Sequence, residues 1–463
     1  MKRFSFFLAD VVALNLALIA TIAIRYQGEF NYQYQLHLTP FSVVFMAWLV
    51  IFYITNLYDQ QSWRNSVTFY SNMWQAMISA TLLSVVFFYF IPFFGITPKT
   101  NLFLFIVLFA IIELALRSLF NRIVSTYFAR RTLIVGVTTQ TLELVQYLKD
   151  NPQIGYRLVA LADLGTTLFD ARHTTNPEIT VVRNVDALPD FIRHQHIETV
   201  VISPEGYQLP QLIDMLYRLL EQRVTFYNLA TFYERVTGKV PLGAINQIWF
   251  LENFSEENRG WYALAKRVLD IACAAILSVL LLPLYPFIAL AIKLESKGPV
   301  FYRQFRMGKG SKPFTLIKFR NMVANDPMGG AESSSGPVWA AENDQRATRV
   351  GKYLRRSRID ELPQLWNVLK GEMSFVGPRP ERPEFHDKLK DQIPFYEERY
   401  LVTPGLTGWA QIKHKLDFRV GMTVEDTAEK LQHDLYYIKN RSLLLDLGIL
   451  LRTINILLQR VLS

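Results

Sequence analysis

Long apolar segments dominate the first part of the chain. They run over residues 4–24, 40–57, 73–94 and 102–119, and each is close to the ~20 residues that a helix needs to cross a bilayer. The first segment is too long, and too closely followed by the others, to be a cleaved signal peptide. The pattern therefore predicts a bundle of four transmembrane helices over residues 1–125.

Basic residues near the ends of these segments predict the orientation of the bundle. Lys2 and Arg3 precede the first segment, whereas the short loops on the other side carry only Arg25 and Lys99. Further arginines end or follow the fourth segment, at Arg117, Arg122, Arg130 and Arg131. Since short loops rich in Lys and Arg stay in the cytoplasm, we expect both ends of the bundle to be cytoplasmic.

Ionisable residues are few within the apolar segments. Asp10 lies in the first segment, and Glu113 and Arg117 are four residues apart in the fourth. Such residues are candidates for function when they lie inside a membrane. Here they lie near the segment ends, so we expect them to reach the membrane interface or to form a salt bridge along one helix.

The next part of the chain alternates short apolar runs with helical patterns. The runs occupy residues 132–137, 158–162, 198–203 and 224–228. The helical patterns lie at residues 141–149, 185–195 and 208–222. This alternation predicts a parallel, Rossmann-like sheet over residues 130–250. A dinucleotide fingerprint needs three glycines after the first strand, and only Gly136 is present, so we expect a degenerate regulatory, scaffolding or dimerisation domain without a nicotinamide or flavin cofactor.

A fifth apolar segment, residues 271–292, follows Lys266, Arg267 and Asp270. Its length fits a transmembrane helix, but Pro283 lies at its centre, and an interior proline kinks or breaks a helix. Both flanks are also basic, which favours the cytoplasmic side for both ends. We therefore expect a re-entrant membrane hairpin over residues 266–295, with a kinked full crossing as the alternative.

Composition narrows the classes of function. Hydrophobic residues make up 51% of the 463 residues and charged residues only 19%, less than the roughly 25% of an average soluble protein. The net charge of +9 then favours a membrane surface or phosphorylated substrates over nucleic acid. The single cysteine, Cys273, excludes an intramolecular disulfide, and its apolar surroundings predict a buried, inert thiol.

Candidate chemistry concentrates in residues 357–371. Asp360 and Glu361 stand just ahead of Pro363, and proline is favoured in the first turn of a helix, as glycine is just past its end. A short helix is thus predicted over residues 363–370, with both carboxylates at its N-terminus, where negative charge is stabilised. Arginines lie immediately upstream, at Arg355, Arg356 and Arg358. The cluster suits a site that handles phosphate, although a capped helix with solvated charges would show the same residues.

Other motifs in the last part of the chain also suit phosphate. Lys318 and Arg320 follow an alternating run that predicts a strand, with both side chains on one face. Arg379 lies between Pro378 and Pro380, and a rigidly held guanidinium suits a phosphate or carboxylate. Residues 322–344 are predicted to form a mobile loop, residues 403–411 a rigid turn, and residues 431–439 and 443–462 two helices, the last on the membrane surface.

Together these motifs resemble the bacterial sugar transferase domain of the monotopic phosphoglycosyl transferases. The resemblance covers residues 266–463. The residues that carry it, in order, are Lys266, Arg267, Asp270, the central Pro283, Lys318–Arg320, Asp360–Gln364, Gly377–Pro380, Pro404–Trp409 and Asp434–Lys439. The preceding spans and Rossmann-like domain resemble the long form of this family, the undecaprenyl-phosphate sugar phosphotransferases.

The resemblance implies a fold and a reaction. The fold is a membrane protein of α plus α/β class, with a four-helix bundle, a degenerate Rossmann-like domain, and a mostly helical catalytic domain over residues 260–463. In the reaction, a nucleotide diphosphate sugar, expected to be UDP-linked, gives its sugar 1-phosphate to undecaprenyl phosphate. This would be the first membrane step of exopolysaccharide, capsule or O-antigen synthesis, at the bacterial inner membrane with the catalytic domain facing the cytoplasm.

The resemblance also implies roles for individual residues. Asp360 would be the covalent nucleophile and Glu361 its partner, and both would hold a magnesium ion. Substrate and phosphate contacts are expected from Lys318, Arg320, Arg358, Pro378, Arg379, Glu381, Trp409, Gln411 and Asp434. A homodimer through the middle domain is a further expectation.

Two alternatives remain open from the sequence. One is a metal-dependent transferase that forms the phosphodiester directly, without a covalent intermediate. The other is a membrane scaffold or sensor that recruits an exopolysaccharide complex through its middle domain. The identity of the sugar has no signal in the residues.

Overall fold

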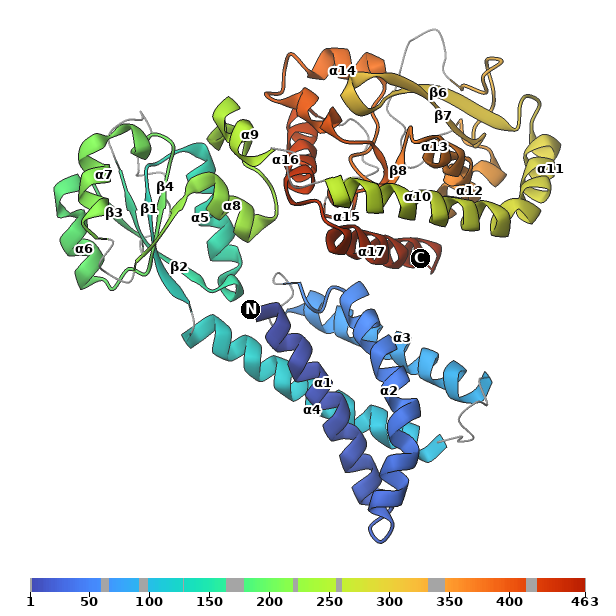
Figure 1. The fold of residues 1–463 in the computed structure, drawn as a ribbon, viewed down its shortest axis with the longest axis horizontal. Coiled ribbons are helices and arrows are strands. Elements are labelled where there is room, and N and C mark those ends of the chain that lie inside the picture. Colours follow the sequence, from blue (N-terminus) through green and yellow to red (C-terminus); the bar gives the residue numbers. More distant parts are fainter. Residues whose placement is uncertain are drawn as a thin grey trace. The chain divides into compact units, whose positions relative to one another are not determined.

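The structure is a computed structural model that describes residues 2–59, 66–90, 99–127, 129–163, 179–219, 224–254, 260–331, 346–413 and 423–462. Contacts divide the chain into two compact units, Met1–Phe232 and Tyr233–Ser463 (Figure 1). The first unit holds the N-terminal helices and the parallel sheet. The second holds all of the candidate site residues.

Four long helices begin the first unit. They are α1 (Lys2–Arg25), α2 (Phe30–Ile54), α3 (Val67–Phe90) and α4 (Lys99–Tyr127). Each contains a stretch long and apolar enough to cross a membrane, which makes this a membrane protein. Helix α2 begins ten residues before the predicted start and carries Pro40 in its interior. Residues 91–94 of the third predicted span lie outside the described residues.

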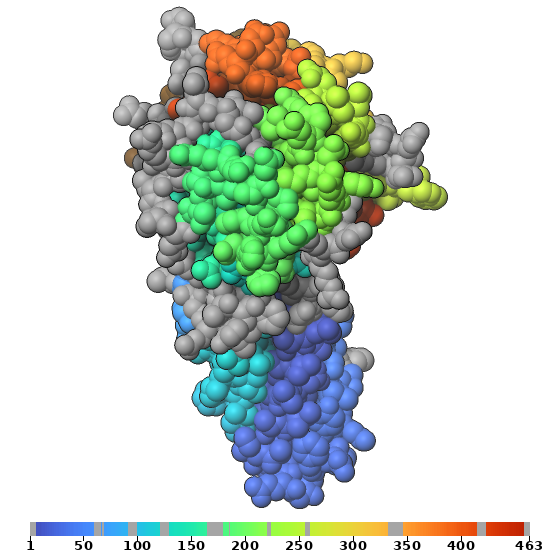
Figure 2. All heavy atoms as spheres, turned by 90° about the vertical axis from the view of Figure 1, so that its left-hand side faces the viewer, coloured from blue at the N-terminus to red at the C-terminus, as the bar shows by residue number. Residues whose placement is uncertain are grey.

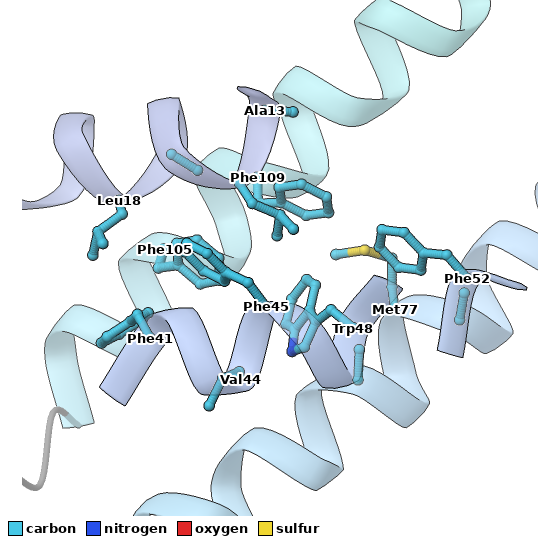
Figure 3. Packing of buried hydrophobic residues seen from close by; sticks show 14 of the residues in the cluster. Ala13, Leu18, Phe41, Val44, Phe45, Trp48, Phe52, Met77, Phe105 and Phe109 are labelled. Atoms are coloured by element: carbon cyan, nitrogen blue, oxygen red, sulfur yellow. The ribbon is translucent and has the colours of Figure 1, made fainter. Parts of the chain in front are cut away.

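Aromatic side chains fill the space between these helices. Trp48 of α2 lies with its ring centre 5.2 Å from that of Phe109 and 5.5 Å from that of Phe105, both on α4 (Figure 3). Its Nε1 donates to the hydroxyl of Ser84 on α3 at 2.8 Å, so the polar atom of a buried indole has a partner. Helices α1 and α4 lie side by side (dark blue and cyan in Figure 2).

The ionisable residues of these helices are buried, contrary to the expectation that they reach the interface. Arg117 Nη2 lies 2.6 Å from Asp10 Oδ2, its Nε contacts Glu113, and its Nη1 donates to the Leu57 carbonyl at 2.9 Å. The Tyr58 hydroxyl also donates to Asp10, at 2.6 Å. The predicted pair along α4 is present. The side chains do not extend to the surface because they pair with one another, across α1 and α4, and with Leu57 and Tyr58 just after α2.

The middle of the chain forms the predicted parallel sheet. Its five strands run in the order β3-β2-β1-β4-β5 and all neighbours pair in parallel. The strands are β1 (Arg130–Val135), β2 (Tyr156–Ala162), β3 (Thr180–Val182), β4 (Thr199–Ile202) and β5 (Thr225–Asn228). The helices between and after them are α5 (Thr139–Asp150), α6 (Leu188–His194), α7 (Pro210–Tyr217) and α8 (Leu229–Thr237). The short edge strand β3 had no clear sequence pattern.

The second unit is a mixed domain in which helices surround two small sheets. One sheet is the antiparallel hairpin of β6 (Phe301–Met307) and β7 (Pro313–Phe319), and the other pairs β8 (Ser374–Val376) in parallel with β9 (Gly405–Thr407). The helices are α9 (Gln247–Asn253), α10 (Gly260–Leu281), α11 (Tyr285–Glu295), α12 (Arg349–Ser357), α13 (Leu365–Lys370), α14 (Pro383–Leu389), α15 (Trp409–Lys413), α16 (Val424–Asn440) and α17 (Leu443–Leu462).

The fifth apolar segment breaks at its central proline. Helix α10 ends at Leu281, a single turn of 3₁₀ helix (Leu282–Leu284) contains Pro283, and α11 then leaves in a new direction (Figure 1). Helix α10 packs against α13, and α11 packs against α12. The outward side chains are apolar and exposed, which suits contact with lipid. Cys273 lies on this exposed face, so the prediction of a buried thiol is wrong.

Candidate active site

The carboxylate pair lies in a tight turn between two helices. Helix α12 ends at Ser357, and Arg358 adopts a left-handed backbone conformation with φ 56°. A 3₁₀ turn, η10 (Ile359–Gln364), then contains both carboxylates and Pro363 and leads into α13. The predicted helix therefore begins earlier than Pro363. The carboxylates lie inside its first, tighter turn because the left-handed Arg358 reverses the chain before them.

Asp360 is buried and held by an amide. Its side chain accepts a hydrogen bond of 2.7 Å from Asn321 Nδ2, just after β7. Burial, and next the negative charge of Glu361, raise the pKa of Asp360 to about 6, against the opposing effect of Lys318 and Asn321. The carboxylate is thus more basic than usual and still ionised at neutral pH.

The backbone geometry that places Asn321 depends on a glycine. A Cβ added to Gly351 of α12 would lie 1.9 Å from the Asn321 carbonyl oxygen. The Thr348 N–H, at the start of the same helix, donates to that carbonyl at 3.2 Å. Close approach of α12 thereby fixes the amide beside Asp360.

Glu361 has the opposite environment. Burial would raise its pKa, but the charges of Arg358, Arg379 and Lys318 outweigh this and hold the pKa at about 2. Nitrogens of Arg358 and Arg379 each lie 3.3 Å from its carboxylate. The two neighbouring carboxylates are therefore separated in basicity, a pattern that assigns them different chemical roles.

Lys318 of β7 reaches the same site. Burial lowers the pKa of its amine to about 8, against the opposing attraction of Asp360 and Glu361. Its Nζ lies 4.9 Å from the ring centre of Tyr302, which faces it across the hairpin. The amine is mostly charged at neutral pH and lies close enough to both carboxylates to stabilise negative charge there.

Arg320 does not join Lys318. The strand ends at Phe319, so the alternation that would put both side chains on one face stops there. The buried guanidinium of Arg320 donates to the carbonyls of Ser296 and Lys297 at 2.8 and 2.5 Å. It holds the end of α11, and we do not count it among the phosphate ligands.

Arg379 lies on an irregular segment between its two prolines. Its guanidinium side chain is 44% exposed, whereas Pro378 and Pro380 are buried. The Arg379 carbonyl accepts a bond of 3.2 Å from Arg399 Nη2, and Arg399 forms a buried ion pair with Asp434 of α16 at 2.8 Å. Asp434 therefore supports the turn from behind instead of facing a substrate.

Backbone packing explains the glycines of this region. A Cβ on Gly405 would lie 2.1 Å from the Gly377 nitrogen, and one on Gly408 would lie 2.2 Å from the Gly377 carbonyl oxygen. The turn before Arg379 thus touches the backbone at both ends of β9, at Gly405 and Gly408, and only glycine permits the contact. Glu381 is buried nearby, and its carbonyl accepts from the Met307 N–H at 2.8 Å.

Trp409 and Gln411 lie on α15, which follows this contact. Trp409 is buried, stacks on Tyr436 with ring centres 5.2 Å apart, and donates to the Gly238 carbonyl at 2.9 Å. It anchors α15 on α16. Gln411 lines a pocket that Glu361 also lines, and its Nε2 is buried without a hydrogen-bond partner among the described residues.

The three polar residues at the start of the hairpin fix α10 to the rest of this unit. Arg267 donates to the carbonyls of Val368 and Leu369 at the end of α13, at 2.6 and 2.8 Å. Asp270 accepts from the Phe375 N–H at 3.1 Å. Lys266 pairs with Asp446 of α17 at 2.7 Å. These residues position the site and do not line it.

Sequence reasoning missed three residues that position the site: Asn321, Asn367 and Arg399. Asn367 is fully buried, and its amide bonds the backbone of β7 at Thr315 and Ile317, at 2.7 and 3.2 Å. It ties α13 to the strand that carries Lys318. For Asn367, its place within the otherwise apolar face of α13 could have predicted a buried amide with hydrogen-bond partners.

Two families of known proteins match this chain. Residues 261–460 match the bacterial sugar transferase family, and residues 53–230 match a family described as a CoA-binding domain. A UDP-N-acetylgalactosamine-undecaprenyl-phosphate N-acetylgalactosaminephosphotransferase of Aeromonas hydrophila is 42% identical over 52% of this chain and 54% of its own length. A UDP-glucose:undecaprenyl-phosphate glucose-1-phosphate transferase of Xanthomonas campestris is 34% identical over 70% of this chain and 66% of its own length.

The chain thus spans about half of the first relative and about two thirds of the second. A UDP-glucose:undecaprenyl-phosphate glucose-1-phosphate transferase of Caulobacter vibrioides is 44% identical over 47% of this chain and 79% of its own length. With the family match over the whole of the domain that carries Asp360 and Glu361, the chain belongs to the bacterial sugar transferase family.

Proposed function

We propose that this protein transfers a sugar 1-phosphate from a UDP-linked sugar to undecaprenyl phosphate and releases uridine monophosphate. The observation that carries the proposal is the buried Asp360, more basic than its neighbour and surrounded by cations. The names of the relatives, which combine a UDP-sugar with undecaprenyl phosphate, support the two substrates.

In the first step, a carboxylate oxygen of Asp360 attacks the phosphorus that bears the sugar. The bond from that phosphorus to the oxygen bridging the two phosphates breaks, and the monophosphate leaves with the electron pair. The product is an acyl phosphate between Asp360 and the sugar phosphate. The raised pKa makes Asp360 the better nucleophile of the pair, whereas Glu361 stays anionic and holds Arg358 and Arg379 in place.

In the second step, a phosphate oxygen of the lipid attacks the same phosphorus, and the Asp360 carboxylate leaves. The products are the lipid diphosphate sugar and the free enzyme. Lys318, Arg358 and Arg379 would stabilise negative charge on the non-bridging oxygens in both steps. Arg379, whose side chain is 44% exposed against 17% for Arg358, is suited to contact the departing nucleotide phosphate.

Asp360 and Glu361 fit a magnesium ion. Among the described residues, no group of three or more metal-ligating side chains is present. Magnesium accepts such a site, because it commonly binds one or two carboxylates and completes its shell with water and substrate phosphates. When bound, the ion would offset the repulsion between the attacking carboxylate and the diphosphate.

The broken apolar segment supports a location of this chemistry at a membrane. We propose that α10 and α11 enter and leave the bilayer from the cytoplasmic side, so that the site faces soluble nucleotide sugars and lipid phosphates together. The reaction would be the first membrane step of exopolysaccharide, capsule or O-antigen synthesis. The names of the relatives include both N-acetylgalactosamine and glucose, so the family does not fix the sugar.

The test is nucleotide release by the purified full chain with undecaprenyl phosphate and a panel of UDP-sugars. One sugar is expected to support release, and labelled uridine monophosphate should exchange into that donor without lipid, since the first step needs none. Asp360→Asn should abolish both reactions. Turnover without exchange would instead indicate direct transfer, and no release with any donor would leave only a scaffold or sensor role.

A further inference from the structure

An apolar groove in the second unit runs from the carboxylate site to helices α10 and α17. We call it the chain groove. Its volume is about 210 Å³, and Glu361 and Arg358 line it together with side chains from α10 and α17. Leu277 and Leu281 come from α10, and Leu450, Thr453, Ile456 and Leu457 come from α17.

The outer faces of these two helices are also apolar. On α10, Val279 and Leu280 are 72% and 66% exposed, and on α17, Leu444 is 81% exposed. Surfaces of this kind, on helices of this composition, contact lipid. The chain groove is therefore continuous with the side of the unit that faces the membrane.

The polar groups in the chain groove are almost all engaged. The hydroxyls of Thr407 and Thr453 bond each other at 2.7 Å, and Arg358 bonds Glu361. The exception is Gln411, whose Nε2 is buried without a partner in the described part of the chain. A buried donor without a partner costs about 1–3 kcal/mol, so an acceptor from a ligand or an ordered water would stabilise this position.

We propose that the chain groove binds the part of the acceptor's isoprenoid chain next to its phosphate, with Gln411 donating to a phosphate oxygen. This inference rests on the proposed function for the identity of the acceptor. An occupant that is apolar along α10 and α17 fits the groove, and at its carboxylate end Arg358 offers a cation to a phosphate. A lipid phosphate has both properties, whereas a soluble nucleotide sugar has no apolar part of this length.

The volume of the chain groove limits how much of the chain it holds. Pockets that enclose a drug-sized ligand have volumes of roughly 300–1,000 Å³, and this one is smaller. Only the isoprene units nearest the phosphate would fit, with the remainder in the bilayer. The Michaelis constant for the acceptor should therefore fall over the first few isoprene units and then reach a plateau.

The experiment uses the full chain in detergent micelles and two readouts. Lipid-dependent release of uridine monophosphate gives the KM of the acceptor, and exchange of labelled uridine monophosphate into the donor reports the first step alone. Acceptors of increasing length, from geranyl and farnesyl phosphate to undecaprenyl phosphate, test the plateau. Ile456→Trp fills the groove, and Ile454→Trp is its matched control, because Ile454 is 49% exposed on the same helix and lies outside the groove.

We expect Ile456→Trp to raise the KM of undecaprenyl phosphate by about tenfold or more, as mis-sized apolar pockets do, with exchange retained. Gln411→Leu should raise it as well, and Ile454→Trp should leave it within twofold of the wild type. Equal KM values for Ile456→Trp and the wild type would overturn the inference while the function stands. If Ile456→Trp also loses exchange, the wild-type chain-length series decides: the inference fails if KM is independent of length.

Failure of the proposed function looks different. It would appear as no nucleotide release and no exchange by the wild type with any donor, whatever the acceptor.

Discussion

If Asp360 is the nucleophile, its hydrogen bond from Asn321 should extend the reaction to lower pH, because this bond opposes the rise in pKa caused by burial. A hydrogen bond to a charged group contributes about 1.5–3 kcal/mol, and one pKa unit corresponds to about 1.36 kcal/mol. Asn321→Leu removes the donor at nearly constant volume, so the pKa of Asp360 should rise by about 1–2 units above its value of about 6. The ionised fraction at pH 7 would then fall from about nine tenths to between about one half and one tenth.

The assay is the pH dependence of exchange, which reports the first step without lipid. For the wild type, the rate should fall tenfold per pH unit below about pH 6, because only ionised Asp360 attacks. For Asn321→Leu, the same limb should begin near about pH 7–8, and its rate should approach that of the wild type at higher pH, where loss of the Lys318 charge above its pKa of about 8 slows both proteins alike. Asn325→Leu is the control, since Asn325 bonds the Ala331 carbonyl and not Asp360.

An unchanged acid limb in Asn321→Leu, with the protein folded, would refute the assignment of Asp360 as the group that titrates. A uniform loss of rate at all pH values would point to a displaced nucleophile instead of a shifted pKa. The melting temperature of each variant, measured at the same pH values, separates both results from loss of folding.

Three further predictions concern stability and the segment that carries Arg379. Asp360→Asn should raise the free energy of unfolding while abolishing transfer. Because the pKa of Asp360 in the folded state, about 6, exceeds its ordinary value of 3.8, the wild type loses stability as the pH rises from about 4 to about 6. The variant cannot ionise and avoids this loss, which corresponds to about 2 pKa units, or about 3 kcal/mol. Its melting advantage should grow between pH 4 and 6 and then level off; a constant advantage would contradict this. Asp434→Asn leaves the buried Arg399 without its counter-charge, so it should lower the free energy of unfolding by about 3 kcal/mol and weaken donor binding through Arg379. Asp387→Asn, at the surface, is the control and should have neither effect. Gly405→Ala forces a Cβ against the Gly377 nitrogen and should lower both the melting temperature and the activity. Gly260→Ala, with open space around its Cβ, should change neither much. Equal behaviour of the two variants would show that the backbones at Gly377 and Gly405 can separate without loss.

The sequence alone was sufficient for the order and type of the larger elements. The length of the apolar segments indicated the four N-terminal helices. The alternation of short apolar runs with helical patterns indicated the parallel strands, because both patterns follow from local burial. Pro283 marked the break between α10 and α11, since proline cannot continue the hydrogen bonds of a helix. The Asp360–Glu361 pair was also visible, as was Arg379 between its prolines.

Tertiary structure decided which of these polar residues share one site. Arg320 shares a motif with Lys318, and Asp434 and Trp409 belong to other motifs of the same resemblance. Arg320 bonds backbone carbonyls, Asp434 pairs with a buried arginine, and Trp409 stacks on Tyr436 of α16. Asn321 carried no pattern, because its role depends on the approach of α12 some thirty residues later in the chain. A sequence records which groups can ionise or donate. Burial and distance decide which do so together, and these are properties of packed elements that no local pattern contains.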